Sequence, residues 1–322
     1  MIEGQQKAVD QFLAAWTTRR MHHAWLLAGP RGVGKGSFAR AAAKKVLADA
    51  AGPPPDESGL DVSPDHMVSH LIAAGSHPDY RLLERLENPK TGSLSRNISV
   101  GQVRALGDML SVTGSLSAWR VIVVDAADDL EREAANALLK MLEEPPANTL
   151  FLLVAHAPGR LLPTIRSRCR RLYFAALDDD AMTSLLSRVY PEKNMPEINQ
   201  LIKYANGSAG RAVQAAALDL APLEVAALSI MTNGDGDNAR RAALASQLSG
   251  KAAGERYTAF LDMVPALIAR EARGLTEPRR GRALDAYAMA RETAVLAPRL
   301  TMDPGTTAYQ LGTILAAIAL KR

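Results

Sequence analysis

The stretch that decides the fold is AWLLAGPRGVGKGSF at residues 24–38. Its first five residues are apolar and predict a short buried strand, whereas residues 37–47 carry Ala, Arg, Lys and Leu at helical spacing. Between them, GPRGVGK at residues 29–35 has the spacing of glycines and lysine that forms a phosphate-binding loop. A strand, a glycine-rich loop and a helix in this order are the context that a true P-loop needs. The sequence therefore predicts a P-loop domain.

This loop keeps the groups that bind phosphate and lacks those that hydrolyse it. Gly36 follows the lysine and supplies no hydroxyl for magnesium, and Ser37 comes one residue late, which on a helix rotates its side chain by about 100°. A second apolar run ends in Asp125, a candidate metal ligand, but Ala126 follows where an acidic residue is expected. We therefore expect no robust ATP hydrolysis by the isolated chain. The candidate nucleotide-binding residues of this degenerate site are Gly29, Gly32, Gly34, Lys35, Gly36, Ser37 and Asp125.

Predicted strands alternate with predicted helices as far as Phe174. RVIVVD at residues 120–125 is a run of β-branched residues, typical of a parallel strand covered on both faces, and TLFLLV at residues 149–154 is the next buried run. A strand is also predicted from His77, and a helix over residues 99–112. This alternation indicates an α/β domain built on a parallel sheet.

After Phe174 the strand pattern ends. Three short helices are predicted at residues 178–188, 196–205 and 210–218, and the chain is helical again from about residue 222. We expect a mixed fold, α/β plus all-α, in three domains. The P-loop domain would span residues 1–175, a small three-helix lid residues 176–220, and a helical C-terminal domain residues 221–322.

The composition is that of an ordinary globular protein. The 322 residues are 48% hydrophobic and 22% charged with a net charge of +4, so nucleic-acid contact and simple solvation of basic helix faces both stay open. No apolar run has the length of a membrane span and the N-terminus has no secretory segment, so we expect a cytoplasmic protein without membrane contact. Cys169 is the only cysteine, which excludes an intramolecular disulfide and a multi-cysteine zinc site.

Four further motifs, together with the loop, resemble a known family. They are SHPD at residues 76–79, DAAD at 125–128, NALLKMLEEPP at 136–146 and TIRSRC at 164–169. A helix that ends in LEEPP, followed later by SRC, is similar to the bacterial clamp-loader subunits of the AAA+ superfamily, and the defects of the loop match their delta-prime branch. The sequence GSAGR, which ends at Arg211, is similar to the second-sensor arginine region.

The resemblance implies a RecA-like domain, a lid and a C-terminal collar that joins subunits into a ring. It implies a subunit that does not hydrolyse ATP itself and helps to load a sliding clamp onto primed DNA. Its enzyme class, a nucleotidyltransferase, would then come from membership of a DNA-directed DNA polymerase. Its partners would be the delta and tau/gamma subunits, and it would meet the clamp and the DNA through the complex.

One departure concerns zinc. Related subunits often carry a four-cysteine zinc module in the region that residues 52–75 occupy here, and residues 56–75 contain no cysteine. We interpret His66 and His70 in this segment as surface residues rather than metal ligands. We therefore expect no zinc, no other metal and no required cofactor, while ATP or ADP binding stays open.

The resemblance makes Arg168 a candidate arginine finger that acts on a neighbouring subunit, with Ser167 and Cys169 helping to set its position. A guanidinium at a neighbour's γ-phosphate stabilises charge that grows in the transition state. The other interpretation is a basic surface cluster that forms salt bridges, in which Arg168 is joined by Arg166, Arg170 and Arg171. Where a polar first-sensor residue would stand, the chain has Ala155.

Two other functions fit a P-loop. A catalytically active AAA+ ATPase, such as a clamp-loader motor subunit or a helicase loader, would hydrolyse ATP as a purified chain, and Gly36, Ala126 and Ala155 argue against it. A nucleotide or small-molecule kinase would explain neither residues 167–169 nor the helical C-terminal region, and a screen of phosphate acceptors would test it. We favour the subunit that does not hydrolyse ATP.

Overall fold

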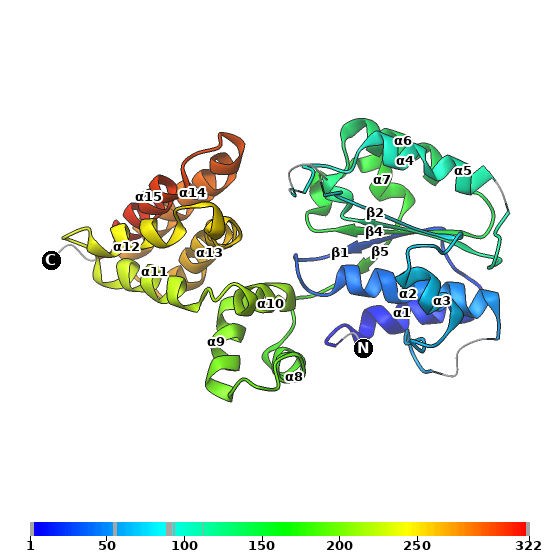
Figure 1. The fold of residues 1–322 in the computed structure, drawn as a ribbon, viewed down its shortest axis with the longest axis horizontal. Helices are drawn as coiled ribbons and strands as arrows, with labels where there is room; N and C mark the ends of the chain where they lie inside the picture. The colour runs from blue at the N-terminus through cyan, green and yellow to red at the C-terminus, as the bar shows by residue number, and fades with distance from the viewer. Residues whose placement is uncertain (1–2, 54–56, 88–91, 93, 112, 320–322) are drawn as a thin grey trace. The chain divides into compact units, whose positions relative to one another are not determined.

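The computed structural model describes residues 3–53, 57–87, 92, 94–111 and 113–319 (Figure 1). The chain forms two compact units. The first unit comprises Met1–Leu185 and Asn206–Gly210, and the second comprises Leu186–Ala205 and Arg211–Arg322.

The first unit is built on a parallel sheet of five strands in the order β2-β3-β4-β1-β5. The strands are β1 (Ala24–Ala28), β2 (Tyr80–Glu84), β3 (Arg120–Asp125), β4 (Thr149–Ala155) and β5 (Arg170–Tyr173). Every residue of β1 and β4 is buried, because these strands lie inside the sheet and are covered on both faces. The predicted parallel α/β sheet is confirmed.

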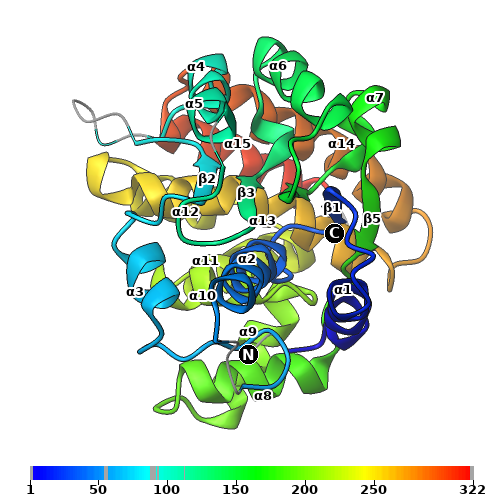
Figure 2. The same cartoon turned by 90° about the vertical axis from the view of Figure 1, so that its right-hand side faces the viewer.

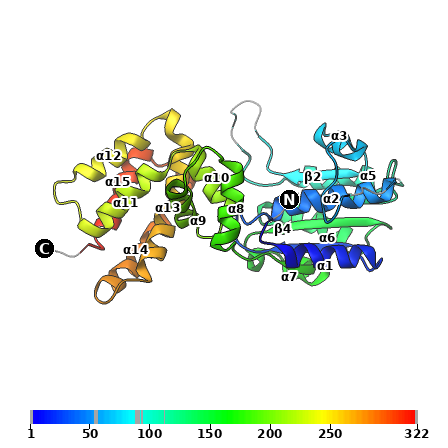
Figure 3. The ribbon, with the colours of Figure 1, turned by 90° about the horizontal axis from the view of Figure 1, so that it is seen from below.

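Helices cover both faces of this sheet. They are α1 (Gln6–Thr17), α2 (Lys35–Ala51), α3 (Met67–Ala73), α4 (Val100–Arg104), α5 (Leu106–Ser111), α6 (Arg132–Glu143) and α7 (Pro163–Arg168). Trp25 and Leu27 of β1 belong to one core with residues of α1 and α2, whereas Leu26 belongs to the other core with residues of α4, α6 and α7. Figures 1 and 2 show the two helical layers on opposite sides of the strands, and Figure 3 views the layer of α1 and α2.

Two local predictions were wrong in detail. The helix predicted over residues 99–112 is two short helices, α4 and α5, and α4 begins with a capping box in which Ser99 and Gln102 exchange hydrogen bonds. Residue 112 itself lies outside the described residues. The strand predicted from His77 begins only at Tyr80, because the residues before it form a turn.

The turn before β2 explains the SHPD motif. Asp79 is buried, and its carboxylate accepts hydrogen bonds from the backbone amides of Ser115, Leu116 and Ser117 at 2.8, 2.8 and 2.9 Å. These three amides belong to the loop that leads into β3. The aspartate therefore joins the beginning of β2 to the loop before β3, and its role here is structural.

The segment at residues 52–75 packs as part of the first unit. Leu60, Val62 and Val68 are buried in the core that also contains α1 and α2. His66 caps α3, its Nδ1 accepting a hydrogen bond from the Val68 amide at 3.1 Å, and His70 is exposed. Across the parts of the chain that the structure describes, no three His, Cys, Asp or Glu side chains gather where they could hold a metal ion.

Three short helices follow the sheet, as predicted: α8 (Asp179–Val189), α9 (Met195–Ala205) and α10 (Ala209–Ala217). The boundary between the two units passes through them, since residues 206–210 group with the sheet and α9 groups with the second unit. The domain limits at residues 175 and 220 remain a prediction.

The second unit continues as a helical bundle. Its helices are α11 (Ala221–Asn233), α12 (Ala239–Leu248), α13 (Gly254–Ala272), α14 (Arg279–Arg299) and α15 (Pro304–Ala316), around buried residues such as Phe260 and Leu311. Of the helices in the described ranges, none alone is long and apolar enough to cross a membrane, although α10 and α11 pass that test as a pair bent by 102°.

Candidate functional site

The phosphate loop follows β1, an interior strand that lies between β4 and the edge strand β5. Ligands of open parallel sheets bind at this carboxyl edge. Gly32 and Gly34 have φ angles of 78° and 95°, a left-handed conformation that favours glycine. Helix α2 begins at Lys35, so the amides of its first turn face the loop. The P-loop architecture that the sequence predicts is therefore present.

Lys35 is turned back onto its own loop. The residue is 2% exposed, and its ammonium donates hydrogen bonds to the carbonyl oxygens of Gly29, at 2.7 Å, and of Pro30. Burial lowers the pKa of Lys35 to about 8, although the carboxylates of Asp128 and Asp125 oppose this shift. The charge that would meet a terminal phosphate is thus satisfied by the loop backbone.

The loop is also held by residues 206–210, which belong to the same unit. The Gly210 amide donates a hydrogen bond to the Gly32 carbonyl at 2.8 Å, and Ser208 Oγ donates one to the Arg31 carbonyl at 2.9 Å. A Cβ atom on Gly32 would lie 2.2 Å from Ser208 Oγ. Gly32 is therefore required both by its backbone angle and by the close approach of these residues.

The residues at the magnesium position do not fit a metal ion. A Cβ atom on Gly36 would lie 2.5 Å from Oδ2 of Asp125, so the carboxylate packs against the glycine backbone. The same Oδ2 pairs with Nη1 of Arg40 at 3.1 Å. Ser37, the only hydroxyl nearby on α2, is exposed. The structure thus brings Gly36 and Asp125 together as the sequence predicts, but adds a guanidinium that the sequence analysis did not identify.

The remaining polar groups of an ATPase site are also replaced. Ala126 and Ala155 are buried, and their methyl groups cannot polarise water. Asp128 instead holds the turn after β4, where it accepts a hydrogen bond from the Ala157 amide at 2.9 Å. The neighbouring His156 was not predicted as a site residue, although a polar residue directly after a buried strand indicates a position at the carboxyl end of the sheet. Burial and the Lys35 charge lower the pKa of His156, so its imidazole is neutral near pH 7.

Arg168 ends α7 and is fixed by two contacts. Its Nη2 pairs with Oε1 of Glu143 at 2.7 Å, and its Nη1 donates a hydrogen bond to the Thr164 carbonyl at 3.1 Å. Ser167 Oγ donates to the same carbonyl at 3.0 Å. Glu143 is the last residue of α6, so the LEEPP and SRC motifs meet through this ion pair. Arg168 was predicted as a site residue from the sequence but Glu143 was not, because the two residues belong to separate helices.

Arg168 and the phosphate loop lie at opposite ends of two neighbouring strands, Arg168 at the amino end and the loop at the carboxyl end. Strand β5 runs parallel to β1, with Arg170 beside Trp25 and Tyr173 beside Ala28. Arg168 comes just before β5, whereas the loop comes just after β1. Four strand residues span roughly 13 Å. Arg168, which is paired with Glu143, therefore lies at the end of the strands opposite to the nucleotide loop of its own chain.

Cys169 is a packing residue. It is buried, and burial raises the pKa of its thiol to about 12, so the nucleophilic thiolate is absent near neutral pH. The next residue, Arg170, places its guanidinium 4.7 Å from the centre of the Trp25 ring. The burial of Cys169 and the contact of Arg170 with Trp25 hold the chain at the beginning of β5. The Arg168 side chain, just before them, is about one third exposed.

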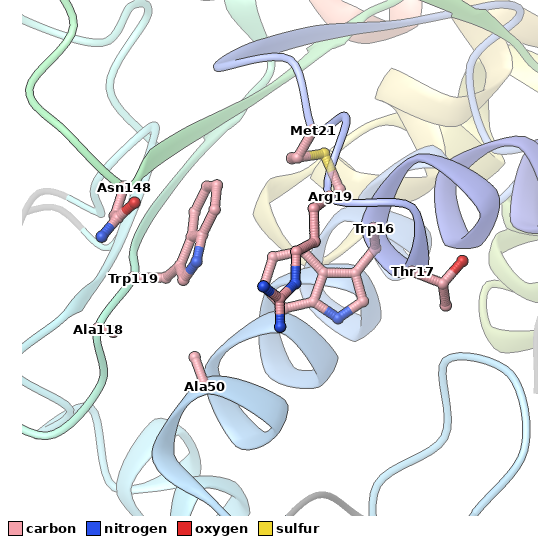
Figure 4. A pocket seen from close by; sticks show the side chains of 8 residues that line it. All are labelled: Trp16, Thr17, Arg19, Met21, Ala50, Ala118, Trp119 and Asn148. Carbon is pink, nitrogen blue, oxygen red and sulfur yellow. The ribbon is translucent and has the colours of Figure 1, made fainter.

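A cavity of about 520 Å³ opens at the edge of the sheet where the strands begin (Figure 4). It is lined by Trp16, Thr17, Arg19, Met21, Ala50, Ala118, Trp119 and Asn148. The rings of Trp16 and Trp119 meet edge to face with their centres 5.2 Å apart. These eight residues include none of the predicted site residues.

Arg211, the predicted second-sensor residue, lies in the first turn of α10 and belongs to the second unit. Its role toward the phosphate loop remains a prediction. In the same unit, Arg270 is a structural cross-link, since it donates to Glu224 at 2.7 Å, to Glu271 at 2.8 Å and to the Lys203 carbonyl at 3.2 Å. It therefore joins α9, α11 and α13 rather than offering a free cation.

The chain is similar to known proteins of one family. The family model described as "DNA polymerase III, delta subunit" matches residues 4–178. DNA polymerase III subunit delta' of Pseudomonas aeruginosa is 37% identical over 186 residues, which are 58% of this chain and 53% of that protein. Subunit delta' of Escherichia coli is 34% identical over 179 residues, 56% of this chain and 50% of that protein.

DNA polymerase III subunit tau of Salmonella typhimurium is 30% identical over 213 residues, 64% of this chain and 30% of that protein. The chain therefore spans about half the length of the delta' proteins that it matches. The family model covers more than half of the chain, including the phosphate loop and Arg168. By these matches the chain belongs to the DNA polymerase III delta subunit family, in its delta' branch.

Proposed function

We propose that this chain is the delta' subunit of the DNA polymerase III clamp loader. In this role it helps to load the sliding clamp onto primed DNA, does not hydrolyse ATP itself, and supplies Arg168 to the ATP site of a neighbouring subunit. The observation that carries the proposal is the separation of the two sites, with the phosphate loop closed at one edge of the sheet and Arg168 presented at the other.

The closed loop supports the absence of hydrolysis. A P-loop ATPase needs a lysine at the terminal phosphates, a hydroxyl and a carboxylate for magnesium, and a polar group for the attacking water. Here Lys35 contacts its own loop, Asp125 pairs with Arg40, and Ala126 and Ala155 supply no polar group. The magnesium ligands and the group for the attacking water are missing at separate positions, so a single substitution would not restore turnover.

The position of Arg168 supports action on a neighbour. An arginine finger must be rigid enough to keep its direction and accessible enough to reach a phosphate on another chain. Glu143 and the Thr164 carbonyl fix the guanidinium, while about one third of the side chain is exposed. In a ring of subunits, the edge of the sheet opposite to the loop is free to face the nucleotide of the adjacent subunit.

We propose the delta and tau/gamma subunits as direct partners, and the clamp and primed DNA as partners met through the complex. The helices of the second unit from α11 onward would form the collar that joins the ring. ATP or ADP in the phosphate loop is not required for this role, nor is zinc. The place of action would be the replication machinery of the bacterial cytoplasm.

The test of the proposed function is assembly. The purified chain is mixed with the delta and tau/gamma subunits of the same bacterium and the mixture is separated by size-exclusion chromatography. We expect one complex that contains all three, and we expect a chain truncated after Leu218 to elute apart from the others, because a ring interface needs a large apolar surface. Separate elution of the full-length chain would contradict the proposal.

A further inference from the structure

A cation of the protein lies where a metal ion would be expected. Arg40 is one helical turn beyond Gly36 on α2, so both residues are on the same helix face. Its Nη1 is 3.1 Å from Oδ2 of Asp125, and its Nη2 is 3.3 Å from Oε2 of Glu84. Glu84 and Asp125 are paired neighbours at the ends of β2 and β3. One guanidinium therefore bridges two carboxylates at the carboxyl edge of the sheet.

The glycine beside this ion pair leaves room for it, because a larger residue would force the Asp125 or Arg40 side chain to move. A Cβ atom on Gly36 would lie 2.5 Å from Oδ2 of Asp125 and 3.0 Å from Nη1 of Arg40. The backbone of Gly36 is helical, so its backbone angle alone would accept other residues. The space that a magnesium-binding Ser or Thr would need is filled by the ion pair itself. We therefore expect the residue at position 36 and the Arg40–Asp125 ion pair to be energetically coupled.

We propose that the Arg40 guanidinium takes the place of the magnesium ion, as a fixed internal cation that neutralises Asp125 and makes the phosphate loop independent of divalent metal. An arginine keeps its charge at any physiological pH and has only hydrogen-bond donors, so it cannot act as a metal ligand. Magnesium requires oxygen ligands in a nearly octahedral arrangement. At this site the Asp125 carboxylate is already paired with Arg40, and Ser37, the hydroxyl residue of α2, is exposed.

This inference deepens the proposed function, on which its biological meaning rests, because it gives the absence of hydrolysis a specific cause. It also defines the ligand class. A nucleotide that entered the loop would do so as a metal-free phosphate. Its negative charge would be met by the Arg40 guanidinium, and by the Lys35 ammonium only if this group left the carbonyl oxygens of Gly29 and Pro30. The side chain of Arg40 is 43% exposed, so part of its donor set remains open to such a phosphate.

The first test is a double-mutant cycle on the full chain, with the urea midpoint of unfolding as the readout. Gly36→Ser should lower the midpoint in the wild-type background, because the new side chain collides with the ion pair. In the Arg40→Ala background the same substitution should lower the midpoint measurably less, since the carboxylate can then move. The matched control is Lys44→Ala, which removes a cation one turn further along α2 and should leave the full effect of Gly36→Ser. Equal shifts in the Arg40→Ala and wild-type backgrounds would overturn the inference.

The second test uses Mn²⁺ as a magnetic probe of the metal position. The electron spin resonance spectrum of Mn²⁺ is first recorded with ATP alone. Addition of the wild-type chain should not change this spectrum. Mn²⁺ immobilised by the wild-type chain and released in Asp125→Asn would overturn the inference. Both readouts are separate from the proposed function, because failure of the complex to assemble would leave the Gly36 and Arg40 coupling untouched.

Discussion

Replacing Arg168 by alanine should lower the stability of the chain only slightly and the activity of the assembled clamp loader strongly. The substitution removes one ion pair, to Glu143 at 2.7 Å, and one hydrogen bond, to the Thr164 carbonyl at 3.1 Å. The two ion-paired side chains are 35% and 46% exposed, so water screens their attraction. A pair of this kind stabilises a fold by about 0.2–1 kcal/mol. The free energy of unfolding should therefore fall by no more than about 1 kcal/mol.

The effect on a neighbouring ATP site should be much larger. An arginine finger contributes on the order of 10³–10⁵ in rate, which corresponds to roughly 4–7 kcal/mol of transition-state stabilisation at the one site that loses it. DNA-stimulated ATP hydrolysis by the assembled loader should fall, and clamp loading should fall with it. The complex should still assemble, because the substitution leaves the second unit unchanged.

The assay needs a loader of verified stoichiometry, reconstituted with wild-type or variant chain, in which ATP hydrolysis and clamp loading are measured on primed DNA. Arg168→Lys should recover little of the ATP hydrolysis and clamp loading that Arg168→Ala loses, since a compact ammonium cannot reproduce the planar guanidinium. Arg171→Ala is the matched control, an exposed arginine of β5 that should behave like wild type. Normal clamp loading by Arg168→Ala would refute the finger and leave Arg168 as a surface ion pair.

Three further outcomes follow from buried groups. Because burial raises the pKa of the Cys169 thiol to about 12, a disulfide reagent should label it slowly in the folded chain and fully in urea, and rapid labelling of the native protein would contradict its buried position. Burial lowers the pKa of Lys35 to about 8, below the ordinary value of 10.5, so the unfolded chain binds this proton more tightly. The free energy of unfolding, measured relative to Lys35→Met, should therefore rise between about pH 8 and pH 10.5, and a flat difference would refute the shift. Asp79→Ala leaves three backbone amides without an acceptor and should destabilise the fold by on the order of 3 kcal/mol, whereas Asp79→Asn should cost less. Equal urea midpoints for the two Asp79 variants would count against the three-amide account.

The sheet and the loop could be predicted because their signals are local. A buried parallel strand is a short apolar run, and a phosphate loop is a fixed spacing of glycines before a lysine, so residues 24–38 identify both without any long-range information. The missing hydroxyl at Gly36 and the alanine at position 126 were visible for the same reason. The LEEPP helix was also predicted, since its apolar spacing and the following prolines define its end.

The contacts that give these residues their roles could not be predicted. Glu143 pairs with Arg168 only because α6 and α7 lie together on one face of the sheet. Arg40 reaches Asp125 only because Gly36 lets α2 approach β3 so closely. Sequence periodicity gives the face of a helix but not the partner of a polar side chain on that face. The cavity lined by Trp16 and Trp119 was missed for the same reason, since its lining comes from segments that are far apart in the sequence.

The most direct test of the central claim is ATP turnover by the purified chain alone with saturating Mg²⁺. The closed loop, the Arg40–Asp125 ion pair and the buried Ala126 predict no hydrolysis above background. Lys35→Ala should then be indistinguishable from wild type in this assay. Clear magnesium-dependent turnover that Lys35→Ala abolishes would contradict the claim that this chain acts without hydrolysing ATP.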